Sequence, residues 1–137
     1  MRALAVRCVL PAAVLAAAST RPVAADPQPG GGRLRPPGFV TCDRNLLTSY
    51  TGRVVALDRG RDRTDLRFET DEGTREPVSI RHPGASVLPF FHLAGEPFSE
   101  PDWAVILEGG RLRPGARATA WVCSDGTNPQ IDWERPR

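Results

Sequence analysis

Cysteine and histidine are the side chains of this sequence that are best suited to nucleophilic, redox or metal chemistry. After the first 25 residues there are two of each, Cys42 and Cys123, and His82 and His92. A catalytic thiol needs a lowered pKa and usually a histidine base, and thiol redox pairs favour a Cys-x-x-Cys spacing. The histidines stand in no recognisable nucleophile motif, and the cysteines are far apart in the chain. We therefore expect no catalytic residue among them.

A metal site is the alternative use of these four residues. His82, His92, Cys42 and Cys123, with or without Asp125, would offer thiolate and imidazole ligands, which suit copper or zinc. However, ten residues and a Pro-Gly turn separate the two histidines. This spacing favours ordinary roles, His82 in a turn and His92 at an amphipathic edge, and we expect no bound cofactor.

A disulfide bond between Cys42 and Cys123 is the use of the cysteines that the sequence favours, because an oxidising compartment pairs two such thiols. The bond would close a loop of 82 residues, counting both ends. The chain-entropy model gives about 4.5 kcal/mol for a loop of that length. For a small domain this is a large share of the total stability.

The first 25 residues have the layout of a secretory signal peptide. Arg2 and Arg7 precede an apolar run over residues 8–18, and small residues end at Ala25. The run is shorter than the roughly 20 residues that a spanning helix needs. We therefore expect cleavage before Asp26, with no transmembrane anchor afterwards, and a periplasmic or secreted protein. A retained anchor is the weaker interpretation.

The charge of the chain changes sign when the signal peptide is removed. All 18 basic residues are arginine, which indicates a GC-rich bacterial genome, and three of them lie in the signal. The remaining 15 arginines face 16 acidic residues, so the mature chain of 112 residues has a net charge of −1. Phe68 also has acidic neighbours in sequence. These features argue against nucleic-acid binding, which needs a basic surface.

The elements that would position these residues are mainly strands. Residues 26–38 read as a flexible leader rich in proline and glycine, followed by one domain over residues 39–137. Residues 50–80 predict three strands in a meander, with charged or glycine-containing turns between them. The second strand places Leu66 and Phe68 on one face, and the third places Val78 and Ile80 inward.

One short helix is predicted after the meander. Ser99 is its N-cap, Asp102 completes a capping box, and Gly109 and Gly110 end it after two to three turns. The stretch before it, residues 87–95, fits either a helical turn or a loop.

Two further strands follow, over residues 113–123 and 130–134. Three strands, a helix and two strands resemble the OB-fold, a five-stranded Greek-key barrel with a helix between strands three and four. The resemblance covers residues 50–134 and lies in element order, without a diagnostic motif. A β-sandwich or an SH3-like barrel with an inserted helix is the alternative.

The fourth strand suggests a binding face. Ala118 and Ala120 share one side, and Arg117, Thr119 and Trp121 share the other. An exposed tryptophan beside arginine is a common composition of partner-binding surfaces. The segment around Cys42 would instead cover this face if the disulfide forms.

No phosphate loop and no hydrolase or zinc-protease motif occurs in the sequence. We therefore expect a monomeric, non-catalytic binding or accessory module of the bacterial cell envelope, whose partner is a protein or a small envelope ligand. A periplasmic copper- or zinc-binding protein is the second hypothesis, and a small secreted enzyme is the third.

Overall fold

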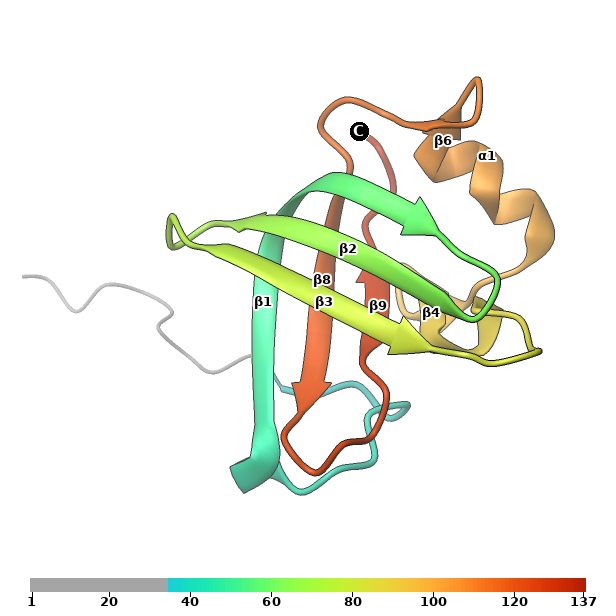
Figure 1. The fold of residues 1–137 in the computed structure, drawn as a ribbon. Helices are drawn as coiled ribbons and strands as arrows, with labels where there is room; N and C mark the ends of the chain where they lie inside the picture. Colours follow the sequence, from blue (N-terminus) through green and yellow to red (C-terminus); the bar gives the residue numbers. More distant parts are fainter. Residues whose placement is uncertain (1–34) are drawn as a thin grey trace, which may run out of the picture. The chain divides into compact units, whose positions relative to one another are not determined.

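The structure is a computed structural model that describes residues 35–137 (Figure 1). The expected signal peptide and residues 26–34 of the expected leader lie outside this range. Among residues 35–137, no helix has the length and apolar character needed to cross a membrane.

The described chain is mainly β, and the expected meander is confirmed. Its strands are β1 (Leu47–Arg59), β2 (Arg63–Thr70) and β3 (Arg75–Arg81), which pair antiparallel in sequence order. Leu66 and Phe68 of β2 and Val78 and Ile80 of β3 are all buried, as their alternation with polar residues predicts.

The prediction of a closed five-stranded barrel is wrong. A seven-stranded open sheet runs in the order β3-β2-β1-β8-β9-β4-β5, and a separate hairpin pairs β6 with β7. The additional strands are β4 (Phe91–Leu93), β5 (Glu96–Pro97), β6 (Leu107–Glu108), β7 (Arg111–Leu112), β8 (Arg117–Cys123) and β9 (Gln130–Trp133). Four of them have only two or three residues, too few for an alternating pattern to develop.

The predicted helix exists but is shorter than expected. A 3₁₀ turn, η3 (Glu100–Asp102), leads into α1 (Trp103–Ile106). The capping box is confirmed, because the Asp102 carboxylate accepts hydrogen bonds from both the backbone and the hydroxyl of Ser99. The glycine pair does not end the helix. Gly109 and Gly110 have positive φ and form the turn of the β6–β7 hairpin. The first strand of this hairpin begins at Leu107, directly after the last residue of α1.

The core lies on one face of the sheet. It includes Phe91 and Trp133, whose rings meet edge to face, and the small residues Ala118 and Ala120 of β8. Trp103 of α1 packs edge to face on Phe91, which fixes the helical turn against this core.

Strand β1 belongs to two parts of the sheet. Its first half pairs with β8, from Leu47 to Arg53, and its second half pairs with β2, from Gly52 to Arg59. Figure 1 shows β1 bending where it passes from one partner to the other. A bulge between Val54 and Ala56 lies just after this point, and bulges of this kind increase strand bending.

Candidate functional site

The stretch around Cys123 is held by a disulfide bond. Cys42 and Cys123 are bonded, with their Cα atoms 6.3 Å apart, within the range of ordinary disulfides. Cys123 ends β8, and Cys42 lies before the first strand. The bond therefore fixes the segment that precedes the sheet to the end of a central strand.

A second contact fixes the same segment to β4. The ring of Phe39 stacks on the imidazole of His92, with ring centroids 3.5 Å apart. Since β9 lies between β4 and β8, residues 39–42 pass across β9 from one contact to the other. Trp121 lies two residues before Cys123 on this face, is 6% exposed and does not belong to the main core. The indole is therefore buried and does not form an exposed surface in this structure.

Three of the four candidate metal ligands are engaged elsewhere, and the fourth, His92, has a buried Nδ1 with no hydrogen-bond partner among the described residues. Both cysteines are in the disulfide, and the two ring nitrogens of His82 lie 2.8 Å from Thr64 Oγ1 and 3.0 Å from the Ala85 carbonyl oxygen. Burial lowers the pKa of His92, against a smaller opposing effect of Asp132. Residues 35–137 contain no group of three or more His, Cys, Asp or Glu side chains arranged to hold a metal ion.

The His82 contacts have the hydrogen-bond polarity of a nucleophile and its base. The Ala85 carbonyl can only accept, so His82 Nδ1 donates to it, and in the neutral ring Nε2 then accepts from the Thr64 hydroxyl. However, Thr64 is 1% exposed, so a substrate cannot reach its hydroxyl. The pair satisfies two buried polar side chains, and this geometry gives the enzyme hypothesis no accessible nucleophile.

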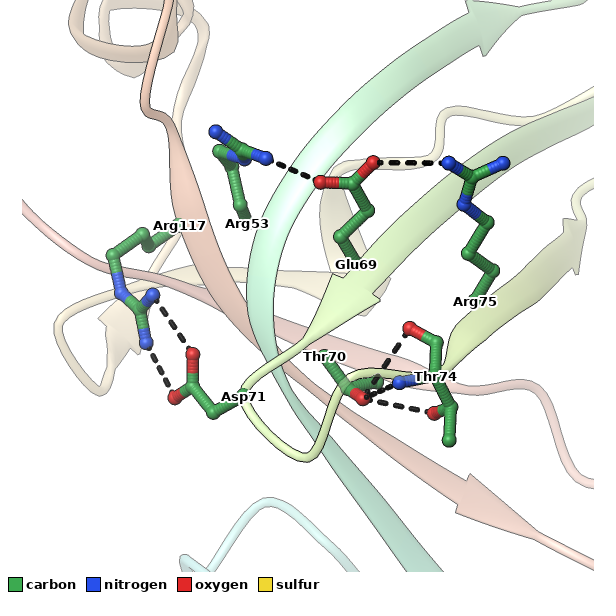
Figure 2. Close-up of polar contacts among 7 residues, drawn as sticks. All are labelled: Arg53, Glu69, Thr70, Asp71, Thr74, Arg75 and Arg117. Atoms are coloured by element: carbon green, nitrogen blue, oxygen red, sulfur yellow. Dashed lines mark hydrogen bonds and ion pairs between the residues drawn. The ribbon is translucent and has the colours of Figure 1, made fainter.

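Arg117, a residue of the predicted binding face, forms ion pairs with two acidic residues, Asp71 and Glu134. Its Nη1 and Nη2 donate to the two carboxylate oxygens of Asp71 at 3.0 and 2.7 Å (Figure 2). Its Nε lies 3.4 Å from Glu134. These contacts raise the pKa of Arg117 and lower that of Asp71. Thr119, the next residue on this face, shares a hydrogen bond of 2.9 Å with Thr51 of β1.

Figure 2 also shows a second ion-pair group beside this one. Glu69 of β2 pairs with Arg53 of β1 and Arg75 of β3, so one carboxylate links three neighbouring strands. In the β2–β3 turn, the Thr70 hydroxyl accepts from the backbone N–H of Thr74 at 3.0 Å. These contacts stiffen the turn that presents Asp71 to Arg117.

Arg117 also lines a cleft near the end of the chain, which we call the C-terminal cleft. Its volume is about 720 Å³, and it is lined by Val105, Ile106, Glu108, residues 113–117 and residues 134–137. The lining combines apolar side chains with arginines and with two carboxylates, Glu108 and Glu134, which pair with Arg113 and Arg117. Pockets of this size and mixed character are typical of ligand sites.

Three further arginines line the C-terminal cleft. Arg113 donates from Nη2 to the Ala104 carbonyl at 3.2 Å and its Nη1 lies 3.8 Å from the Glu108 carboxylate, while its Nε is buried with no hydrogen-bond partner in the described chain. Arg135 and Arg137 make no ion pair or side-chain hydrogen bond with other residues of 35–137. The cleft therefore offers cationic donors that the described chain itself does not satisfy.

Sequence reasoning selected Arg117 but missed the other arginines of the cleft. A signal was present, because Arg113-Pro114 and Arg135-Pro136 are two copies of the same dipeptide near the end of the chain. Proline limits the local backbone and so helps to hold an adjacent arginine at a fixed place. Comparisons of the chain with protein-family models, curated proteins and solved structures find no match.

Proposed function

We propose that this protein is an exported, monomeric, non-catalytic binding module of the bacterial cell envelope, and that its ligand occupies the C-terminal cleft. The observation that carries the proposal is a cleft of about 720 Å³ in which Arg135 and Arg137, which form no ion pair within residues 35–137, stand beside apolar side chains. An ion-paired Arg117 on its wall adds a rigid boundary.

The chemistry of the lining defines the ligand class. Guanidinium groups match carboxylates and phosphates, because their planar donors bind two oxygens at once. Val105, Ile106 and Pro136 offer apolar surface in the same cleft. We therefore propose a ligand that carries an oxyanion next to an apolar group, either as a small molecule or as an acidic, partly apolar segment of a protein.

The strand pairings support a distant OB-like origin for the scaffold, as a proposal beyond its mainly β class. The meander β1–β2–β3 and the return of β8 to pair with β1 are compatible with Greek-key connections. The disulfide fits an oxidising compartment outside the cytoplasm.

We also propose that Trp121 and Thr119 contribute to a secondary partner-binding surface. Trp121 is buried, and residues 39–42 are fixed on either side to Cys123 and His92, so we propose that a partner reaches the indole only after that segment moves. If Trp121→Ala leaves partner capture from envelope extracts unchanged, the secondary surface is wrong and the cleft alone stands.

The cleft can be tested with a matched pair of probes, N-acetyl-leucine and its uncharged amide. NMR titration should show saturable shifts at Ile106 and Ala116 with the acid, and far weaker binding of the amide. Arg135→Gln should weaken binding of the acid by about tenfold, because it removes a charge-assisted hydrogen bond.

Arg67→Gln is the matched control for this titration. Arg67 is an exposed arginine of β2 that does not line the cleft. An equal loss of affinity in Arg67→Gln and Arg135→Gln would show a general charge effect and contradict the proposal. Equal binding of acid and amide would contradict the ligand class.

A further inference from the structure

A second, smaller cleft lies next to η3 and α1. We call it the loop cleft; its volume is about 390 Å³, and it is lined by residues 59–61, Thr64, His82, residues 85–88, Glu100 and Trp103. These residues come from the β1–β2 loop, the connection that follows β3, and the helical turn. Its size suits a small ligand or the headgroup of a larger one.

Two arginines of the loop cleft have no anionic partner in the described chain. Within residues 35–137, neither Arg59 nor Arg61 forms an ion pair or a hydrogen bond through its guanidinium. Arg59 lies over the ring of Trp103, with its Cζ atom 3.7 Å from the ring centroid. This cation–π contact restricts the Arg59 side chain while leaving its N–H groups without acceptors.

A buried donor without a partner belongs to Trp103, which lines the loop cleft. Trp103 is 8% exposed, and its indole Nε1–H finds no acceptor among the described residues. An indole N–H can only donate, and a buried donor without an acceptor is unfavourable. Ser86 adds a second donor, because its Oγ accepts from the Leu88 N–H at 3.1 Å and keeps its own proton available.

Acceptors are scarce in the loop cleft. Thr64 and His82 use their polar atoms on each other and on the Ala85 carbonyl. Glu100 is the single carboxylate of the lining. A cleft with several free donors and one acidic side chain is complementary to a ligand that accepts hydrogen bonds and carries negative charge.

We propose that the loop cleft is a second binding site, and that it takes a small oxyanion, a phosphate or carboxylate group, through Arg59, Arg61 and the indole N–H of Trp103. Two guanidinium groups supply charge and planar donor pairs, and the indole supplies one directed hydrogen bond. The stacked Arg59 loses little further freedom on binding, which favours affinity. The site rests on different residues from the C-terminal cleft and stands independently of it.

The Trp103 indole N–H is itself the reporter for the test. In ¹H–¹⁵N spectra of the uniformly labelled protein, each tryptophan gives one indole signal, and Trp103→Phe assigns the signal of residue 103. Titration with sodium phosphate at constant ionic strength should move this signal saturably. The Trp133 signal should stay in place, because that ring is fully buried in the core.

Two substitutions at the cleft should act in opposite directions. Arg61→Gln should weaken phosphate binding at least fivefold, and Glu100→Gln should tighten it about threefold, because it removes the like charge of the lining. Trp103→Phe should weaken binding about fivefold, followed through the amides of Gly60 and Ser86. Arg113→Gln, in the other cleft, should leave the phosphate titration unchanged.

Parallel titrations with phosphate, sulfate and acetate distinguish the sources of the oxyanion. Preference for phosphate points to a phosphorylated ligand, and preference for acetate points to a carboxylate. The proposal is overturned if none of the three anions gives a saturable shift of the Trp103 signal, or if Arg61→Gln and Glu100→Gln both leave the affinity unchanged. Loss of binding in Arg113→Gln would assign the shift to the other cleft.

Discussion

Arg117 links three parts of the chain through one guanidinium. It lies in β8, bonds both oxygens of Asp71 in the β2–β3 turn, and approaches Glu134 just after β9. Paired donors of this kind give geometric specificity in addition to charge. The contact holds one wall of the C-terminal cleft in place.

The pKa of Asp71 provides a direct measure of this contact. Hydrogen bonding to Arg117 lowers it below the ordinary value, so we expect Arg117→Gln to raise it back toward that value. The pKa can be read from the pH dependence of the Asp71 carboxyl ¹³C shift. An unchanged pKa in Arg117→Gln would contradict the ion pair.

The sign of the stability effect follows from the lowered pKa of Asp71. The contribution is present above the unfolded-state pKa and is lost as the pH falls through the folded-state value. Asp71→Asn should therefore be slightly less stable than the wild type near neutral pH and equal to it in acid. Because both partners are substantially exposed, we expect the difference to stay below about 1 kcal/mol.

At the residue scale, the sequence predicts which side chains are buried better than it predicts which charged side chains lack an ion-pair partner. Leu66, Phe68 and the Ser99–Asp102 capping box follow from patterns between neighbours in the chain. The arginines of the two clefts do not, because whether a guanidinium lacks a partner depends on which distant carboxylates fold beside it. The close approach of Arg59 to Trp103 joins residues 44 positions apart.

Among the elements, β1 depends on one residue where it changes partners. Gly52 pairs with Thr70 on one side and Ala118 on the other. A Cβ atom at residue 52 would clash with the backbone carbonyl of Glu69 and lie 2.7 Å from Thr70 Cα. Glycine therefore permits β2 to cross β1 closely at the bend.

Gly52→Ala should destabilise the fold by about 2 kcal/mol, because overpacking against backbone cannot be relieved by a rotamer change. The free energy of unfolding in urea measures the effect. Gly38→Ala is the matched control, since no atom lies within 4 Å of a Cβ at that position. Similar stabilities of the two variants would contradict the close approach.

The elements that sequence reasoning missed are the short ones. Residues 91–93 form β4 because they meet β9 in parallel, a partner nearly 40 residues away in the chain. Gly109 and Gly110 fit both a helix end and a hairpin turn, and the pairing of β6 with β7 decides between them. These strands depend on tertiary contacts, which local sequence patterns do not report.

The whole molecule has a protected edge at β3. The backbone N–H of Arg81 donates to the Asn128 side-chain oxygen at 3.1 Å, and its carbonyl accepts from the Asn128 amide at 2.7 Å. Backbone groups of Ser79, Pro77 and Arg75 point the same way as those of Arg81, because direction alternates along a strand. Pro77 has no N–H to donate, and both backbone groups of Arg81 are already bonded to Asn128. These two positions of the edge are therefore closed to pairing with a further strand.

Asn128→Ala should increase self-association, because it frees both backbone groups of Arg81 for pairing with another chain. Sedimentation velocity over a range of concentrations measures the change. Asn45→Ala is the control, since its side chain makes no hydrogen bond within the described residues. A variant that stays as monomeric as the wild type would show that Asn128 does not guard the edge.

The disulfide acts on the stability of the whole domain. Replacing both Cys42 and Cys123 by serine should lower the free energy of unfolding by about 2–5 kcal/mol, as for other small exported domains. It should also shift Trp121 emission to the red as residues 39–42 loosen. Intact mass of the wild type should be two hydrogens lower without reductant than with it. An unchanged mass would mean that the bond is absent from the purified protein.

The same bond determines how the domain transmits mechanical load. If the chain is pulled between residues 35 and 137, force passes from Cys42 directly to Cys123 and bypasses every strand from β1 to β8. Only residues 35–41 and 124–137 can then extend, at about 3.5 Å each. Reduction would release the intervening loop as well. An oxidised molecule tethered at its ends therefore keeps the loop cleft outside the loaded path, whereas Arg135 and Arg137 of the C-terminal cleft lie within it.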